Sequence, residues 1–128
     1  MRRSWNTVAL AWLCLTALPL LAGCDSSSVF YGSRVINEAG FVMDYTVLNH
    51  EETAELTLVA GESLRVEFAH DRGSVDVTVG LPDREPIYRG TGQTEAEFTL
   101  TIPESGDYRI SVTGHRASGK AAFLREGR

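Results

Sequence analysis

Residues 96–113 read AEFTLTIPESGDYRISVT, and this stretch decides the fold. Apolar residues alternate with polar ones on both sides of a Pro-Glu-Ser-Gly-Asp corner. Alternation with a period of two is typical of a strand with one buried face and one solvated face. Pro103 ends the first strand because its nitrogen has no hydrogen to donate, and Gly106 permits the turn. We therefore expect two strands joined by a tight corner, with the Tyr108 hydroxyl reaching back to the turn backbone.

The same alternation continues on both sides of the corner, and turn residues separate the runs at intervals of about 8–12 residues. The pattern predicts strands near residues 41–48, 54–59, 63–69, 74–81, 86–89, 95–102, 107–114 and 119–124. Such spacing favours an antiparallel architecture over a helical one. We therefore expect an all-β domain over residues 41–128, an antiparallel β-sandwich or jelly roll of about eight strands.

The N-terminal segment has a different pattern. Arg2 and Arg3 precede a long uncharged apolar run, which is the arrangement of a secretory signal. The run ends in Leu21-Ala22-Gly23-Cys24, which resembles the lipobox of bacterial lipoproteins. In that motif Leu21 suits an apolar subsite, and Ala22 and Gly23 are small enough for a peptidase to approach the bond before Cys24.

The lipobox resemblance implies where the protein resides. Residues 1–23 would be a signal peptide, and residues 24–40 would comprise a lipidated Cys24 and a tether. Two acyl chains on the cysteine suffice for stable attachment to a bilayer. We expect a lipid-anchored protein on the extracytoplasmic face of the cell membrane.

Charge and cysteine content exclude several classes of protein. The chain has 12 Lys and Arg against 17 Asp and Glu, and removing residues 1–23 takes away two arginines and no acid. The remainder has a net charge of 10 − 17 = −7, which argues against binding to nucleic acid. Cys14 and Cys24 are the two cysteines, so the predicted domain has no Cys-ligated zinc site.

Residues 53–124 resemble the bacterial pre-peptidase C-terminal domain and related jelly-roll sandwiches. The resemblance rests on the order of five segments along the chain. They are the Ala60-Gly61-Glu62 turn leading into Ser63–Phe68, then Gly73–Val79, Ile87–Gly90, Phe98–Pro103 and Glu104–Gly114. The resemblance implies a small β-sandwich, such as is found in lipoproteins with one domain of this kind. The corner is a device of the fold and indicates no substrate.

Catalytic motifs are not evident in the sequence. There is no Gly-x-Ser-x-Gly segment of the kind that exposes a nucleophilic serine. The histidines His50, His70 and His115 are far apart in the sequence, and each lies near a predicted strand end. We therefore expect a non-catalytic protein without a cofactor, which binds a protein partner through a sheet face or the turn loops.

Two alternatives are binding of a small ligand and, less favoured, hydrolysis by a small enzyme. Calcium would need six to eight oxygen ligands from loops, and the candidate ligands are Asp71, Asp76 and Asp83. Glycan binding would need exposed aromatic residues. The predicted domain has no tryptophan, so the candidates are Tyr31, Tyr45 and Tyr88.

Overall fold

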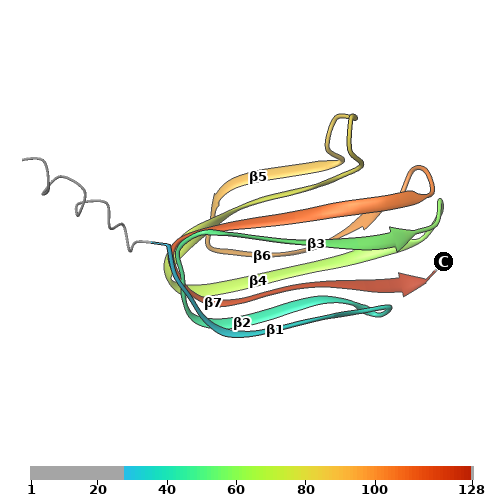
Figure 1. Cartoon of the computed structure of the whole chain (residues 1–128). Coiled ribbons are helices and arrows are strands. Elements are labelled where there is room, and N and C mark those ends of the chain that lie inside the picture. The colour runs from blue at the N-terminus through green and yellow to red at the C-terminus, as the bar shows by residue number, and fades with distance from the viewer. Residues whose placement is uncertain (1–27, 128) are drawn as a thin grey trace, which may run out of the picture.

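A computed structural model describes residues 28–127 (Figure 1). Over this range the chain forms seven antiparallel strands, which confirms the prediction of an all-β fold. The strands are β1 (Phe30–Asn37), β2 (Gly40–Leu48), β3 (Glu51–Leu58), β4 (Ser63–Gly80), β5 (Tyr88–Gln93), β6 (Glu95–Thr101) and β7 (Gly106–Gly127). The described residues contain no helix long and apolar enough to cross a membrane.

Two long strands, β4 and β7, run through both layers of the sandwich. The first layer has the order β1-β2-β7-β4-β6 and uses the second half of β7 and the first half of β4. The second layer has the order β3-β7-β4-β5 and uses the other two halves. Strands that turn a corner in this way let two layers share one core.

The bends of β4 and β7 depend on unusual backbone conformations. Gly73 has a φ of 69° and Arg116 a φ of 53°, both in the left-handed region. A Cβ atom on Gly73 would lie 2.3 Å from the carbonyl oxygen of Arg116, so the two bends approach too closely for a side chain. The predicted strands 63–69 and 74–81 are therefore one bent strand, as are 107–114 and 119–124.

The structure adds a strand ahead of residue 41. Residues 30–37 were expected to belong to the tether, but they form β1, which pairs along its length with β2. Figure 1 shows the chain entering β1 at the end of the sandwich where β4 and β7 bend. Strand β1 pairs with no other strand, so it is an edge of the first layer.

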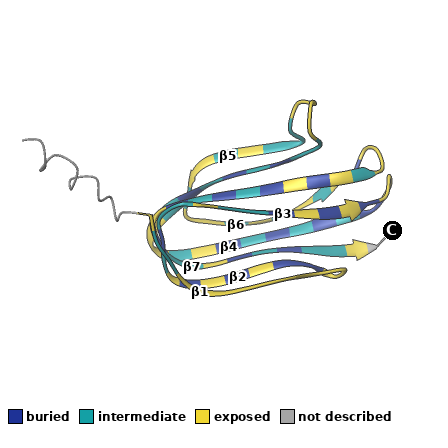
Figure 2. Ribbon diagram, in the orientation of Figure 1, coloured by how far each residue is buried: buried dark blue, intermediate teal, exposed yellow. Residues whose placement is uncertain are grey.

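The core lies between the layers and contains the apolar residues that the alternation predicted to be buried, including Phe68, Val77 and Ile110. Figure 2 shows buried positions alternating with intermediate or exposed ones along β2, β4 and β7. The corner is as expected: Tyr108 is fully buried, and its hydroxyl donates a 2.5 Å hydrogen bond to the carbonyl oxygen of Glu104.

Candidate functional site

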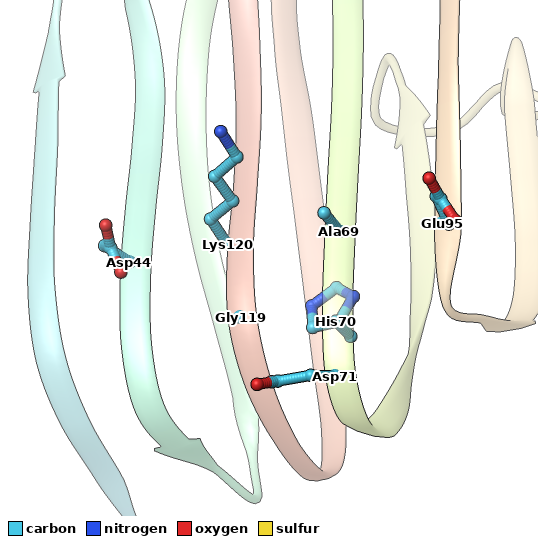
Figure 3. Close-up of a pocket in the computed structure, with 7 residues that line it drawn as sticks. All are labelled: Asp44, Ala69, His70, Asp71, Glu95, Gly119 and Lys120. Carbon is cyan, nitrogen blue, oxygen red and sulfur yellow. The ribbon is translucent and has the colours of Figure 1, made fainter.

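Three adjoining hollows lie on the outer side of the first layer. The central one has a volume of ≈ 430 Å³ and extends from β2 across β7 and β4 to β6 (Figure 3). A second hollow of ≈ 520 Å³ continues toward β1, and a third of ≈ 430 Å³ continues over β4 and β6. Ala69 and Gly119 form part of the floor, so small side chains leave this surface depressed. We call this surface the hollowed face.

Acidic side chains dominate the hollowed face. Five carboxylates line the three hollows together with one lysine: Asp44, Glu67, Asp71, Glu95, Glu97 and Lys120. Arg65 pairs with two of them, Glu67 and Glu97. The other three carboxylates form no ion pair with any residue in 28–127. The side chains that line the central hollow therefore carry a net negative charge.

A buried tyrosine and a histidine support the floor of the central hollow. The Tyr45 hydroxyl lies 2.6 Å from His70 Nε2, and His70 Nδ1 lies 3.2 Å from the carbonyl oxygen of Thr94. A carbonyl accepts only, so Nδ1 carries the hydrogen and Nε2 accepts from Tyr45. Burial, with the nearby Asp44 charge, raises the pKa of Tyr45 above its usual range. Burial lowers the pKa of His70, which keeps the ring neutral.

The structure does not bring the three predicted calcium ligands together. Asp71 lies in the central hollow, whereas Asp83 lies in the loop after β4 with a φ of 63°. Asp76 is on the second layer, where it accepts hydrogen bonds from His115 Nε2 and the Gly92 amide, each at 2.8 Å. Both hydrogen bonds lower the pKa of Asp76, and the bond from His115 has the larger effect. Among residues 28–127 no group of three or more His, Cys, Asp or Glu is placed to hold a metal ion.

Of the three tyrosines considered for glycan binding, Tyr31 alone is exposed, at 67%. Tyr45 is a core residue. Tyr88 is half-buried and packs on Phe98, with ring centroids 4.7 Å apart. An aromatic platform for a sugar would need several exposed rings, and of these three tyrosines the structure exposes Tyr31.

One arrangement resembles a proton relay and was not predicted. Ser28 Oγ lies 3.5 Å from His50 Nδ1, and His50 Nε2 lies 2.5 Å from a Glu52 oxygen. The other Glu52 oxygen pairs with Arg34 at 3.2 Å. Ser28 is exposed, so water competes for its hydrogen bond, and a separation of 3.5 Å is at the outer limit for such a bond. The three side chains therefore follow the order of a relay, with the serine at its exposed end.

Sequence reasoning found Asp71 but missed the rest of the hollowed face. Asp44, Glu95 and Lys120 come from three different strands, and each is an outward position of an alternating run. Lys120 lies opposite Asp44 on one side and Ala69 on the other. This neighbourhood depends on strand register, for which the sequence carries no local signal.

The signal segment, the lipobox and Cys24 lie outside the described residues. Their assignment stays a prediction from the sequence.

Comparison with known proteins gives no family. No family model matches the chain, and no curated protein matches it. Two similar solved structures are a periplasmic inhibitor of g-type lysozyme from Aeromonas hydrophila and a carbohydrate-binding module of Cellvibrio mixtus lichenase 5A. The inhibitor shares 18% identity, covers 76% of this chain and 88% of its own, and has a TM-score of 0.45. The module shares 13% identity, covers 81% and 90%, and has a TM-score of 0.39.

A third similar structure is a family two carbohydrate esterase from Cellvibrio japonicus, with 20% identity. The match covers 77% of this chain and 30% of the esterase, with a TM-score of 0.35. With TM-scores below 0.5, none of these three likenesses indicates a function for this chain.

Proposed function

We propose that this chain is a non-catalytic binding module, held at the outer side of a cell membrane by lipid on Cys24, that binds a protein partner. The observation that carries the proposal is the hollowed face, which extends over all five strands of the first layer. Its three hollows share residues and are open to solvent. A broad, shallow surface of this kind fits a protein better than a small molecule, which is usually enclosed in a deeper pocket.

Charge defines the kind of partner. Asp44, Asp71 and Glu95 surround the central hollow, with Lys120 as the cation among them (Figure 3). A partner with exposed arginine or lysine would be drawn to this face, and its association would weaken as salt screens the charges.

The lipid anchor is a separate part of the proposal and has its own test. Cys24→Ser removes the thiol that would carry the lipid, so we expect the precursor to accumulate without incorporating labelled fatty acid. Cys14→Ser is the matched control and should be processed and labelled normally. Normal cleavage and membrane attachment of Cys24→Ser would contradict the anchor.

The binding face is tested by reversing its charge. The full chain is expressed in its membrane, crosslinked gently, and the protein that comes with it is identified and purified. Binding to that protein is then measured for Asp44→Lys/Glu95→Lys and for Glu55→Lys/Glu85→Lys, which makes the same charge change at exposed positions away from the hollowed face. We expect the first variant to bind at least tenfold more weakly and the second to bind normally. Equal effects, or no partner at all, would contradict this binding site.

A small hydrolase is the competing function, because Ser28, His50 and Glu52 are aligned. A fluorophosphonate probe that labels nucleophilic serines separates the two functions. We expect no labelling of the full chain. Labelling that disappears in Ser28→Ala but persists in Ser26→Ala would make the chain an enzyme.

Glycan binding and calcium binding are alternative functions that titration can test. Tyr31 is the single exposed candidate ring, and the three predicted calcium ligands are apart. Titration of the full chain with oligosaccharides and with Ca²⁺ should show no saturable binding.

A further inference from the structure

The first layer ends in an unprotected edge. The described domain has four edge strands, because β1, β3, β5 and β6 each pair with one neighbour. Three of them carry the features that commonly prevent edge-to-edge pairing. Strand β3 has three glutamates, β6 has two, and β5 is short and contains two glycines and Arg89.

Strand β1 carries fewer of these features, a single glycine and a single arginine. It has eight residues, no proline, no lysine and no acidic residue, and its positions from Tyr31 to Asn37 are all exposed (Figure 2). The irregularity in its pairing with β2 places the extra residue, Thr46, on β2, so β1 itself stays regular. A long regular edge without proline, lysine or acidic residues is a template for another strand.

The one charged residue of β1 points inward, but its charge is compensated within its own chain, so pairing of the edge would not leave it without a partner. Arg34 turns toward the interior side of the layer, where its guanidinium lies 5.1 Å from the centroid of the Phe41 ring. It also donates a hydrogen bond to the carbonyl oxygen of Thr53 and pairs with Glu52 on β3.

Apolar side chains are concentrated at this edge. Of the five large hydrophobic residues that are exposed in the described chain, three are on β1 and one is beside them on β2. These are Tyr31 at 67%, Val35 at 53%, Ile36 at 42% and Val42 at 37%. The Cα of Val35 lies opposite that of Val42, so these two valines form one patch.

We propose that β1 pairs antiparallel with β1 of a second copy of this chain, with Ser33 opposite Ser33 at the two-fold axis. Antiparallel pairing brings residues of the same face together. A two-fold axis must therefore place one residue of β1 opposite the same residue of the second copy. Two such registers pair seven of the eight residues of each strand, one centred on Ser33 and the other on Arg34. The Arg34 register sets two like charges directly opposite each other, which destabilises a strand pair.

The Ser33 register is also complementary in its side chains. Tyr31 lies opposite the second copy's Val35, and Phe30 lies opposite the second copy's Ile36. Arg34 lies opposite the second copy's Gly32, which has no side chain to obstruct it. The exposed apolar residues of the edge thus find apolar partners, and the guanidinium meets no other cation.

Such a dimer would change how a partner binds. The two first layers would form one continuous sheet, with both hollowed faces on the same side, so a partner could bind both at once with gain in avidity. This consequence rests on the proposed function, whereas the pairing itself does not. The lipid anchor would in turn favour the dimer. Copies held in one membrane would meet at a high effective concentration, so a single strand pair could suffice to hold two of them together.

Cysteine crosslinking in the full chain tests the pairing. At the two-fold axis the Cα atoms of Ser33 and its counterpart would be within disulfide range. Ser33→Cys should therefore give a covalent dimer under mild oxidation. Val35→Cys, on the same face, would lie about 14 Å along the strand from its counterpart and should give at least tenfold less. The unmodified chain, oxidised in parallel, accounts for crosslinks through Cys14 or Cys24.

A second substitution, introduced into the Ser33→Cys chain, tests whether the crosslink depends on the β1 edge. Val35→Glu places a carboxylate at the paired edge, so it should abolish crosslinking of Ser33→Cys. The same change at Val59, an exposed valine outside β1, should leave it intact.

Several results would overturn the pairing: no covalent dimer, a stronger crosslink through Val35→Cys, or a crosslink from Ser33→Cys to a different protein. The charge reversal on the hollowed face is an independent experiment, so the failure of one proposal can be told from the failure of the other.

Discussion

The ion pair between Glu62 and Arg125 offers the sharpest test of the fold. Glu62 is the only charged residue of the described chain that is buried, with 6% of its surface exposed. One carboxylate oxygen accepts a 2.7 Å hydrogen bond from the Val59 amide. Arg125 approaches both oxygens, with its Nη2 2.8 Å from Oε2 and 3.1 Å from Oε1. The same arginine donates to the carbonyl of Glu38, so the pair fastens the β1–β2 hairpin to the β3–β4 turn.

Replacing Glu62 with alanine removes the acceptor for the Val59 amide and the partner of Arg125. Breaking a fully buried ion pair costs about 3–5 kcal/mol, whereas an exposed pair contributes about 0–1 kcal/mol. The Arg125 side chain is 27% exposed and can turn toward water, which lowers the cost from the upper limit. We expect Glu62→Ala to reduce the free energy of unfolding by about 3 kcal/mol.

The free energy of unfolding is measured by titrating the full chain with urea and monitoring the transition by circular dichroism. Trp5 and Trp12 lie outside the described domain, so tryptophan fluorescence would not follow its unfolding. Glu97→Ala is the matched control, because Glu97 pairs with Arg65 but its side chain is 62% exposed. Its loss should stay within about 0.5 kcal/mol. A loss below about 1 kcal/mol for Glu62→Ala, or equal losses for both variants, would refute the reasoning.

Three further predictions follow from the core and the hollowed face. Burial lowers the pKa of His70 from its ordinary value of 6.5, so the unfolded chain binds the proton more readily. The stabilising contribution of neutral His70 is complete above pH 6.5 and declines as the pH falls below 6.5. The difference in unfolding free energy between the wild-type chain and His70→Gln should therefore shrink on acidification. A difference that is independent of pH would contradict this. Tyr108→Phe loses the bond to the exposed turn and should cost about 1 kcal/mol in unfolding free energy, so a cost above about 3 kcal/mol would mean that the hydroxyl does more than close the corner. Phe68→Ala should cost about 3–5 kcal/mol and the half-buried Phe98→Ala about 1–3 kcal/mol by the same urea assay; the reverse order would show that the exposure of the two rings is misplaced.

The comparison of sequence and structure shows where local reasoning succeeds. The alternation in 96–113 identified the strands, their buried faces and the Tyr108 corner, because side-chain direction in a strand depends only on local geometry. It missed the continuity of β4 and β7. Turn-forming residues such as Gly73 end a strand in one context and bend it in another, and the choice depends on the neighbouring strand.

The hollowed face and the β1 edge show what local reasoning cannot reach. The sequence by itself determined that the domain is an antiparallel sandwich with an acidic surface, since hydropathy and charge are properties of individual residues. Which acidic residues meet was decided by tertiary structure alone, because Asp44, Asp71 and Glu95 become neighbours only through strand register and the bend of β4. Long-range pairing also left β1 with one neighbour, and an exposed edge cannot be recognised until the order of the strands is known.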